Sequence, residues 1–206
     1  MGLGCGHVGV DAAARVDGGA RQPPGCVNSQ HSHDTAEVFL VHSGTWSFDL
    51  GEHGTDANIT LRPGDLISIP TQVFRGFKNI GDDIGYLWAV LGKDNPGRVT
   101  WAPDVFEMAK QYGLVLLENG SLIDTNKGEV VKEGLKPMPV TSREDVGALQ
   151  VFTNSDLRKC CILADEDVPS NTQAGIKTRK LIGEDTKLNW PHGFTIDDIH
   201  MQPDTK

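Results

Sequence analysis

The sequence has no long apolar run and little positive charge. No stretch approaches the roughly 20 apolar residues of a membrane-spanning helix. Lysine and arginine total 19 against 28 acidic residues, and the net charge of −9 comes without any basic run, which argues against nucleic acid as a partner. The first residues lack the charged start and continuous apolar stretch of a signal peptide. We therefore expect a cytoplasmic protein that binds neither nucleic acid nor a membrane.

Cysteine is scarce, and its spacing excludes the common cysteine motifs. The four cysteines are Cys5, Cys26, Cys160 and Cys161, and no two are spaced as CxxC. Adjacent Cys160 and Cys161 cannot easily bond each other. We expect reduced thiols, with one or both of Cys160 and Cys161 buried as small apolar residues.

The composition that is present suits a β protein rich in turns. The chain has 206 residues, 24 glycines, 11 prolines and 38% hydrophobic residues, enough for a packed core. Residues 37–50 alternate between apolar and polar side chains. Further short strands are predicted at 7–10, 59–61, 66–69, 73–77 and 86–91. Several short strands at this spacing are typical of a sandwich or barrel.

The pattern changes after Gly92. A helix is predicted over 103–112, where Pro103 suits the first turn and Gly113 can end it. A hairpin or loop with a turn at Asn119-Gly120, a short helix over 143–149, and strands over 176–182 and 193–201 follow. We divide the chain into a barrel core (1–95), a helix and loop extension (96–150) and C-terminal strands (151–206).

One segment, residues 25–44, carries the chemistry. It holds His31 and His33 two residues apart, with Glu37 four residues further on. Side chains two apart on a strand point to the same face, and Glu37 can reach the same point if the chain bends at Asp34-Thr35. Two neutral imidazoles and one carboxylate form a ligand set for a divalent metal ion such as Fe, Mn, Ni or Zn.

This spacing resembles the first motif of the cupin superfamily. That motif is Gly, five residues, His-x-His, three or four residues, Glu, six residues, Gly, and it is matched by Gly25, His31, His33, Glu37 and Gly44. The resemblance implies a mainly β cupin jelly-roll barrel, a double-stranded β-helix, with its metal in the mouth.

The second cupin motif is less complete. Its pattern is Gly, five residues, Pro-x-Gly, two residues, His, three residues, Asn, and Gly64, Pro70 and Asn79 match it. Gln72 stands in place of the second glycine. Arg75 stands in place of the fourth metal ligand, and a protonated guanidinium has no lone pair with which to replace a histidine.

Three readings of Arg75 are open. In the first, His31, His33 and Glu37 bind the metal, and Arg75 holds a substrate carboxylate or enolate. In the second, Arg75 pairs with Glu37 and the pocket holds no metal. In the third, Arg75 points outward, and Gln72 or water completes the metal shell.

The resemblance is closest to quercetin-dioxygenase-like cupins, and it implies an oxygen-activating enzyme for a small anionic, enolic or phenolic substrate. Glu37 would bind metal and shuttle a proton, and Arg75 would stabilise an oxyanion. The expected apolar walls are Phe39, Phe48, Phe77 and Trp88. The alternative is a non-catalytic cupin that binds a small anionic metabolite without metal.

The C-terminal strands have two explanations. They resemble the opening strands of a second barrel in two-domain cupins, so the chain would be a fragment of a bicupin. Alternatively, they complete the first barrel or pair with a second subunit, and we expect a homodimer on that basis.

Overall fold

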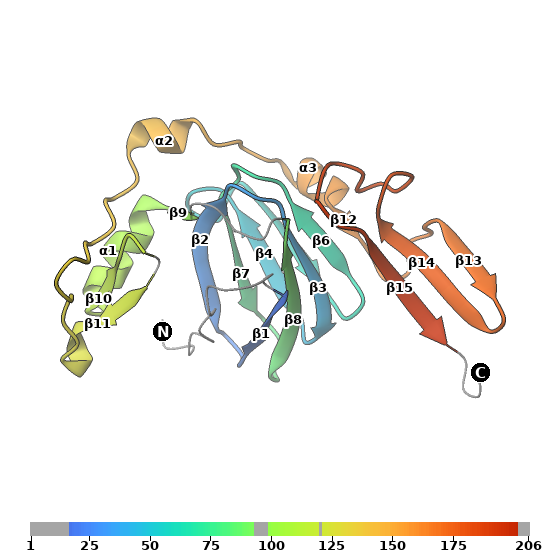
Figure 1. Ribbon diagram of the computed structural model, residues 1–206, viewed down its shortest axis with the longest axis horizontal. Coiled ribbons are helices and arrows are strands. Elements are labelled where there is room, and N and C mark those ends of the chain that lie inside the picture. The colour runs from blue at the N-terminus through green and yellow to red at the C-terminus, as the bar shows by residue number, and fades with distance from the viewer. Residues whose placement is uncertain (1–16, 93–98, 120, 202–206) are drawn as a thin grey trace.

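The computed structural model describes residues 17–92, 99–119 and 121–201, and its centre is a barrel of two five-stranded sheets (Figure 1). One sheet has the order β1-β8-β3-β6-β12 and the other the order β5-β4-β7-β2-β9, with antiparallel pairing throughout. The bounds in the first sheet are β1 Asp17–Gln22, β8 Gly85–Leu91, β3 Glu37–Ser43, β6 Leu66–Ile69 and β12 Cys161–Ile162. Those in the second are β5 Ala57–Leu61, β4 Trp46–Leu50, β7 Arg75–Asn79, β2 Val27–His33 and β9 Val99–Trp101. The predicted jelly-roll architecture is confirmed, while the strand expected at 7–10 lies outside the described residues.

The core lies between these sheets and follows the alternation of the strands. Phe39 on β3 packs against Phe48 on β4 and Phe77 on β7, with ring centroids 5.2 and 5.1 Å from that of Phe39. All three rings are buried and belong to the main hydrophobic cluster. Trp88, which the sequence suggested as a pocket wall, is 53% exposed, so that prediction is wrong. It alternates with buried Leu87 and therefore faces away from the core.

The extension after β9 lies beside the barrel, next to β9 and β2 (Figure 1). It contains α1 Pro103–Gln111, the hairpin of β10 Leu114–Leu116 and β11 Leu122–Asp124, a 3₁₀ turn η1 Thr125–Lys127, and α2 Arg143–Gly147. The predicted helices are confirmed, although α2 is shorter than expected. Val105 of α1 packs with Phe74 and Ala102. Part of the predicted turn, Gly120, lies outside the described residues.

Helix α3, Asn154–Lys159, was not predicted, although the sequence contains its start signal. The Thr153 side chain accepts a hydrogen bond from the Asp156 backbone, and the Asp156 side chain accepts one from the Thr153 backbone. This capping box satisfies two of the amides that a helix start leaves without partners. In the described part of the chain, no helix is both long and apolar enough to cross a membrane.

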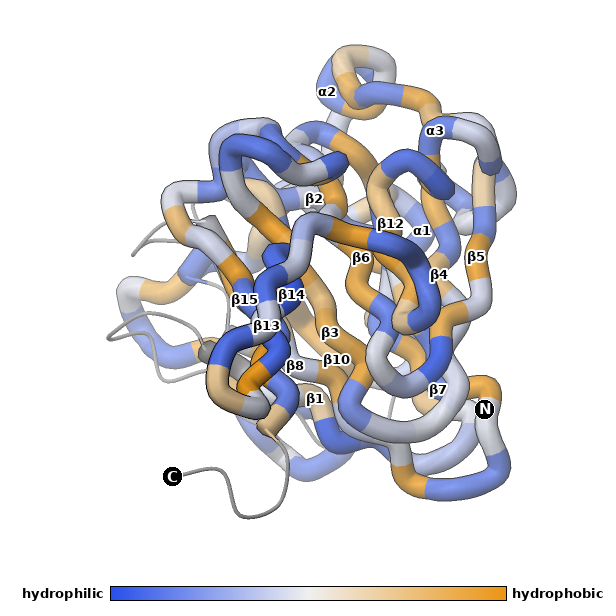
Figure 2. The backbone as a smooth tube through the Cα atoms, turned by 90° about the vertical axis from the view of Figure 1, so that its right-hand side faces the viewer, coloured by the Kyte–Doolittle hydropathy of each residue, from blue (hydrophilic) through white to orange (hydrophobic). Residues whose placement is uncertain are grey.

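The C-terminal strands form a sheet of their own on the outside of the barrel. β13 Ser170–Gln173, β14 Ile176–Ile182 and β15 Ile196–Met201 pair in the order β13-β14-β15. Figure 2 views this side of the molecule and shows the small sheet in front of β3 and β6. Leu181 and Leu188 pack there in one buried cluster with Val38 and Leu66, on the outer side of the barrel strands. The last third of the chain therefore covers one outer face of the barrel.

The cysteines differ from the expectation of four reduced thiols. Cys26 is disulfide-bonded, so the expectation is wrong for that residue. Cys160 and Cys161 are free and buried, as expected. Burial raises the pKa of Cys160 to about 11 and that of Cys161 to about 12. Thiols in this state are protonated and act as packing residues.

The outer cluster predicts that the C-terminal segment is part of the cooperative fold. Leu188 is fully buried, and Leu188→Ala should lower the free energy of unfolding by about 2–5 kcal/mol because it leaves a cavity. Chemical denaturation followed by fluorescence and circular dichroism measures the effect. The control is Val151→Ala, at a site 78% exposed, which should change stability by less than about 0.5 kcal/mol. Equal effects of the two variants would contradict the packing described.

Candidate metal centre

Two consecutive strands of the chain, one from each sheet, bring the sequence-predicted site residues together. β2 ends at His33 and β3 begins at Glu37, so the intervening bend turns Glu37 back toward the histidines. On β2, the pairing with β7 shifts register between Asn28 and His31. After this irregularity His31 lies opposite both Arg75 of β7 and Trp101 of β9.

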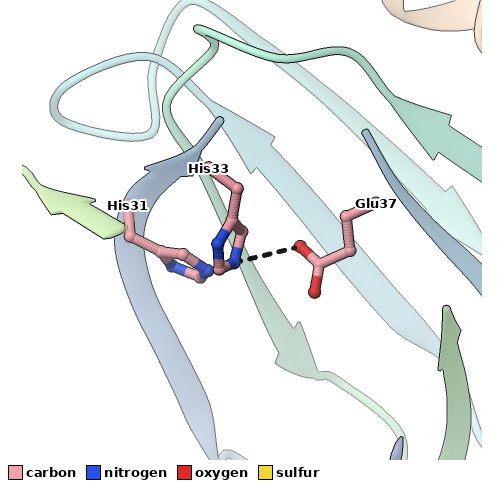
Figure 3. Close-up of side chains that lie close together, drawn as sticks. All are labelled: His31, His33 and Glu37. Atoms are coloured by element: carbon pink, nitrogen blue, oxygen red, sulfur yellow. Dashed lines mark ion pairs between the residues drawn. The ribbon is translucent and has the colours of Figure 1, made fainter. Parts of the chain in front are cut away.

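His31, His33 and Glu37 converge inside the barrel end (Figure 3). One ligand atom from each lies within 4.8 Å of the others. The three residues are 6%, 9% and 7% exposed, and the His33 Nε2 atom lies 3.7 Å from the Glu37 Oε2 atom. The expected juxtaposition of these three side chains is therefore present in the structure.

Both imidazoles are held in the neutral form. Burial, with a smaller contribution from the charge of Arg75, lowers the pKa of His31 and of His33 from 6.5 to about 3. The His31 Nδ1 atom lies 2.7 Å from the Ser29 carbonyl oxygen. A carbonyl only accepts hydrogen bonds, so Nδ1 carries the proton and Nε2 keeps a free lone pair. Neutral imidazoles with an open lone pair are the form that binds metal ions.

Arg75 is wholly buried and binds Glu37. Its Nε and Nη2 groups donate to Glu37 Oε2 at 3.2 and 2.8 Å. Its Nη1 group donates to the carbonyl oxygens of His31 and Val73 at 3.3 and 3.4 Å. The reading in which Arg75 points outward is therefore wrong. Four of the five N–H donors of an arginine are used in these bonds, which leaves one Nη2–H for another partner.

The donor set fits a divalent metal ion in type, protonation and spacing. Both arginine bonds from Nε and Nη2 end on Oε2, so among the described residues Glu37 Oε1 is the oxygen left for another partner. The His33 Nδ1 atom is buried and has no hydrogen-bond partner within the described part of the chain. Metal-binding histidines usually donate this second N–H to an acceptor, which makes His33 the least supported of the three.

Two residues near the site were missed by sequence reasoning. The Trp101 ring lies 5.0 Å from the His31 ring, centroid to centroid, and the Ser29 carbonyl orients that imidazole. Trp101 is about 70 residues after His31 in the sequence. No local sequence pattern predicts that β9 pairs with β2. Ser29 acts through its backbone, which carries no residue-specific signal.

Gln72 occupies the position of the missing motif glycine and adopts its backbone conformation. Its φ is 58°, in the left-handed region that glycine enters at little cost. The Gln72 carbonyl accepts a hydrogen bond from the Gln150 amide at 2.8 Å. The chain thus keeps the turn of the motif, although a non-glycine residue there carries about 1–2 kcal/mol of strain.

A second group of possible metal ligands lies at the surface. His53 Nδ1 is 2.7 Å from Asp104 Oδ2, and Glu52 completes the group. Arg143 binds both Glu52 oxygens, at 2.7 and 3.0 Å. These contacts hold α1 and α2 against the loop after β4, a role that explains the group without a metal.

Comparison with known proteins finds a family match over the segment that contains these site residues. A family described as "Cupin domain" matches residues 20–90. Residues 20–90 are therefore a cupin domain. The matched range contains both strands of the metal centre and Arg75. The two motifs on which the resemblance was first noted therefore lie within the matched cupin domain.

Individual relatives match this cupin only in part. It is 30% identical over 108 residues to germin-like protein subfamily 1 member 7 of Arabidopsis thaliana, covering 50% of this chain and 47% of that protein. The chain thus spans about half the length of the curated relative it matches. Oxalate oxidase in complex with glycolate is similar at 21% identity and a TM-score of 0.37, over 41% of this chain and 44% of that one. Vicilin from Corylus avellana is similar at 15% identity and a TM-score of 0.45, over 81% and 47%.

The buried ion pair predicts a strong asymmetry between single and double substitutions. Arg75→Met should lower the free energy of unfolding by about 3–5 kcal/mol, because it leaves the Glu37 carboxylate buried without its partner. Adding Glu37→Gln removes that charge and should recover most of the loss. Urea denaturation of the metal-free proteins measures both. A double variant no more stable than Arg75→Met would contradict the pairing.

The depressed histidine pKa values predict acid sensitivity. Below pH 6.5 the unfolded chain takes up protons that the folded protein excludes down to a pKa of about 3. Stability should therefore fall as pH drops through this window, by up to about 1.4 kcal/mol per pH unit for each histidine. Denaturation of chelator-treated protein between pH 6.5 and 4 measures the slope.

The matched variants separate these histidines from the other titrating groups. His31→Gln with His33→Gln should flatten the slope, and His42→Gln, at an exposed site on β3, is the matched control. An unaltered slope in the double variant would show that other groups control the acid response.

Proposed function

We propose that the protein is a metal-dependent cupin enzyme, an oxidoreductase that activates oxygen against a small anionic, enolic or phenolic substrate. The observation that carries the proposal is the convergence of two neutral imidazoles and one carboxylate within 4.8 Å inside the barrel. Two histidines and a carboxylate leave open positions on a metal for oxygen and substrate. A bound divalent ion would supply Lewis-acid and redox chemistry at this point.

The chain's own residues would divide the remaining tasks. His31 and His33 would hold the metal through neutral nitrogens, with Ser29 fixing the tautomer of His31. Glu37 would bind the metal and, at the same carboxylate, take up or return a substrate proton. Arg75 is better placed to hold Glu37 in position than to hold a substrate, because its donors already point to Glu37 and to two carbonyls. We therefore propose Arg75 as a positioning residue for that carboxylate.

One observation favours the alternative of a metal-free cupin that binds a small anionic metabolite. The Arg75–Glu37 contact of 2.8 Å leaves the pocket electrically neutral, given two uncharged imidazoles. Adding a divalent cation would place two positive charges beside a buried guanidinium, which is costly where the local dielectric constant is low. Metal content therefore separates the two functions.

The expected location of the protein stays a prediction. The sequence-based expectation was the cytoplasm, but the disulfide of Cys26 counts against it, since disulfides persist mainly in oxidising compartments. A thiol count on protein isolated from its native source under alkylating conditions would decide the point.

The metal hypothesis predicts near-stoichiometric Fe, Mn, Ni or Zn in the purified protein. His31→Ala with His33→Ala should abolish metal retention and leave a folded barrel, because two of the three ligands are lost. Elemental analysis measures the content. The control is His53→Ala with Asp104→Ala, which removes the surface group and should keep the metal. A metal-free native protein, or retention in the His31/His33 variant, would overturn the assignment and favour the anion-binding function.

Arg75→His provides the sharper test of the same site. Arg75 points at Glu37, so a histidine there supplies a fourth ligand, the third nitrogen of the set, and should raise metal affinity at least tenfold in competition with a chelator. Arg75→Gln, which offers no nitrogen lone pair, is the matched control. No gain for the histidine variant over the glutamine variant would place the metal elsewhere.

A further inference from the structure

The C-terminal sheet has an open edge at β15. This strand pairs with β14 on one side, and no strand in the described part of the chain pairs with its other side. Figure 1 shows the small sheet standing beside the barrel. Near the end of β15, Ile199 and Met201 are 58% and 69% exposed. An open edge with exposed apolar side chains is a template for another strand.

The two faces of β15 differ in character. On one face, Ile199 lies opposite Thr178 and Met201 lies opposite Ile176 of β14. The other face carries Asp198 and His200, with the Asp198 carboxylate 3.1 Å from Arg179 and 2.8 Å from His200. Along the open edge the chain therefore presents Asp197 and then two apolar side chains on one face, and a carboxylate next to an imidazole on the other.

We propose that β15 pairs antiparallel with β15 of a second copy of this chain. The two three-stranded sheets would then form one sheet of six strands across a two-fold axis. In such a pair, opposite residues must share a face, because side chains alternate along each strand. A two-fold axis perpendicular to the sheet must therefore lie midway between the two copies of one residue. Only a few registers meet this condition.

The registers differ in which side chains of the two copies lie opposite each other. An axis through Asp197 or Asp198 places a carboxylate opposite its own copy, and an axis through His200 places two imidazoles opposite each other. An axis through Ile199 places this apolar side chain against itself. It also places Asp198 of each copy opposite His200 of the other, twice. A carboxylate can accept a hydrogen bond from the N–H of an opposite imidazole, whereas two carboxylates directly opposite each other destabilise a sheet. The geometry therefore favours the register centred on Ile199.

This dimer does not depend on the proposed metal or activity. The interface lies on the outer sheet, whereas His31 and Glu37 lie inside the barrel. Loss of metal without loss of the dimer, or the reverse, would distinguish failure of one proposal from failure of the other.

Sedimentation of the full chain tests the interface. The native protein should sediment as a dimer, and Ile199→Lys should shift it to monomer by placing two ammonium groups on the axis. The control is Val151→Lys at an even more exposed site outside the sheet, which should leave the dimer intact. A native protein that is monomeric at all concentrations tested, or an Ile199→Lys variant that stays dimeric, overturns the proposal.

Cysteine cross-linking tests the register itself. In the proposed pair, the two copies of residue 199 have Cα atoms about 4.5–5.5 Å apart, within the range that a disulfide bridges. Ile199→Cys should therefore give a covalent dimer on mild oxidation. Asp197 lies two residues from the axis, which puts its two copies about 13 Å apart, too far for a disulfide. The native chain, in which free Cys160 and Cys161 are buried, is a second control. Equal cross-linking of Ile199→Cys and Asp197→Cys, or none with Ile199→Cys, overturns the register.

Discussion

The ion pair between Arg75 and Glu37 is the interaction on which the site depends. It crosses the barrel from β7 to β3 and thus joins the two sheets at the end where the histidines lie. Arg75 also donates to the backbone of His31, so one guanidinium holds both the carboxylate and the strand that carries the imidazoles. Burial of a charge is tolerable only with such partners. The same positive charge contributes to the low histidine pKa values, which keep those nitrogens neutral.

The ion pair makes the pocket chemically compatible with two states, one without a metal ion and one with a metal ion. Without a metal, the pair neutralises itself and the imidazoles carry no charge. With a metal, Glu37 keeps a free oxygen while its other oxygen stays bound to Arg75. A histidine in place of Arg75 would supply a fourth ligand but would release Glu37 from its partner. An arginine at this position therefore provides a fixed carboxylate in place of a further nitrogen.

The sequence predicted those parts of the fold that depend on residues close together in the chain, namely strand alternation and helix boundaries. Alternation placed Glu37, Phe39 and Val41 on the inward face, and Pro103 and Gly113 marked α1. The site was predictable because His31 and His33 share a face of one strand. The contacts that sequence did not reveal join distant segments. Trp88 is as apolar as a core residue, and only the side of β8 on which it falls decides that it is exposed. Trp101 meets His31 only because β9 pairs beside β2.

The outer cluster of Val38 and Leu66 with Leu181 and Leu188 also sets the order in which the protein can be completed during synthesis. The barrel strands leave the ribosome long before the segment that covers them. Until that segment arrives, an apolar face of β3 and β6 stays in contact with water and with other chains. Contacts between such distant segments form slowly, because a long loop must close first. A nascent chain paused before residue 181 would thus expose the apolar outer face of β3 and β6, which is prone to aggregation. Dependence on chaperones should be greatest before residues 181–188 have been synthesised.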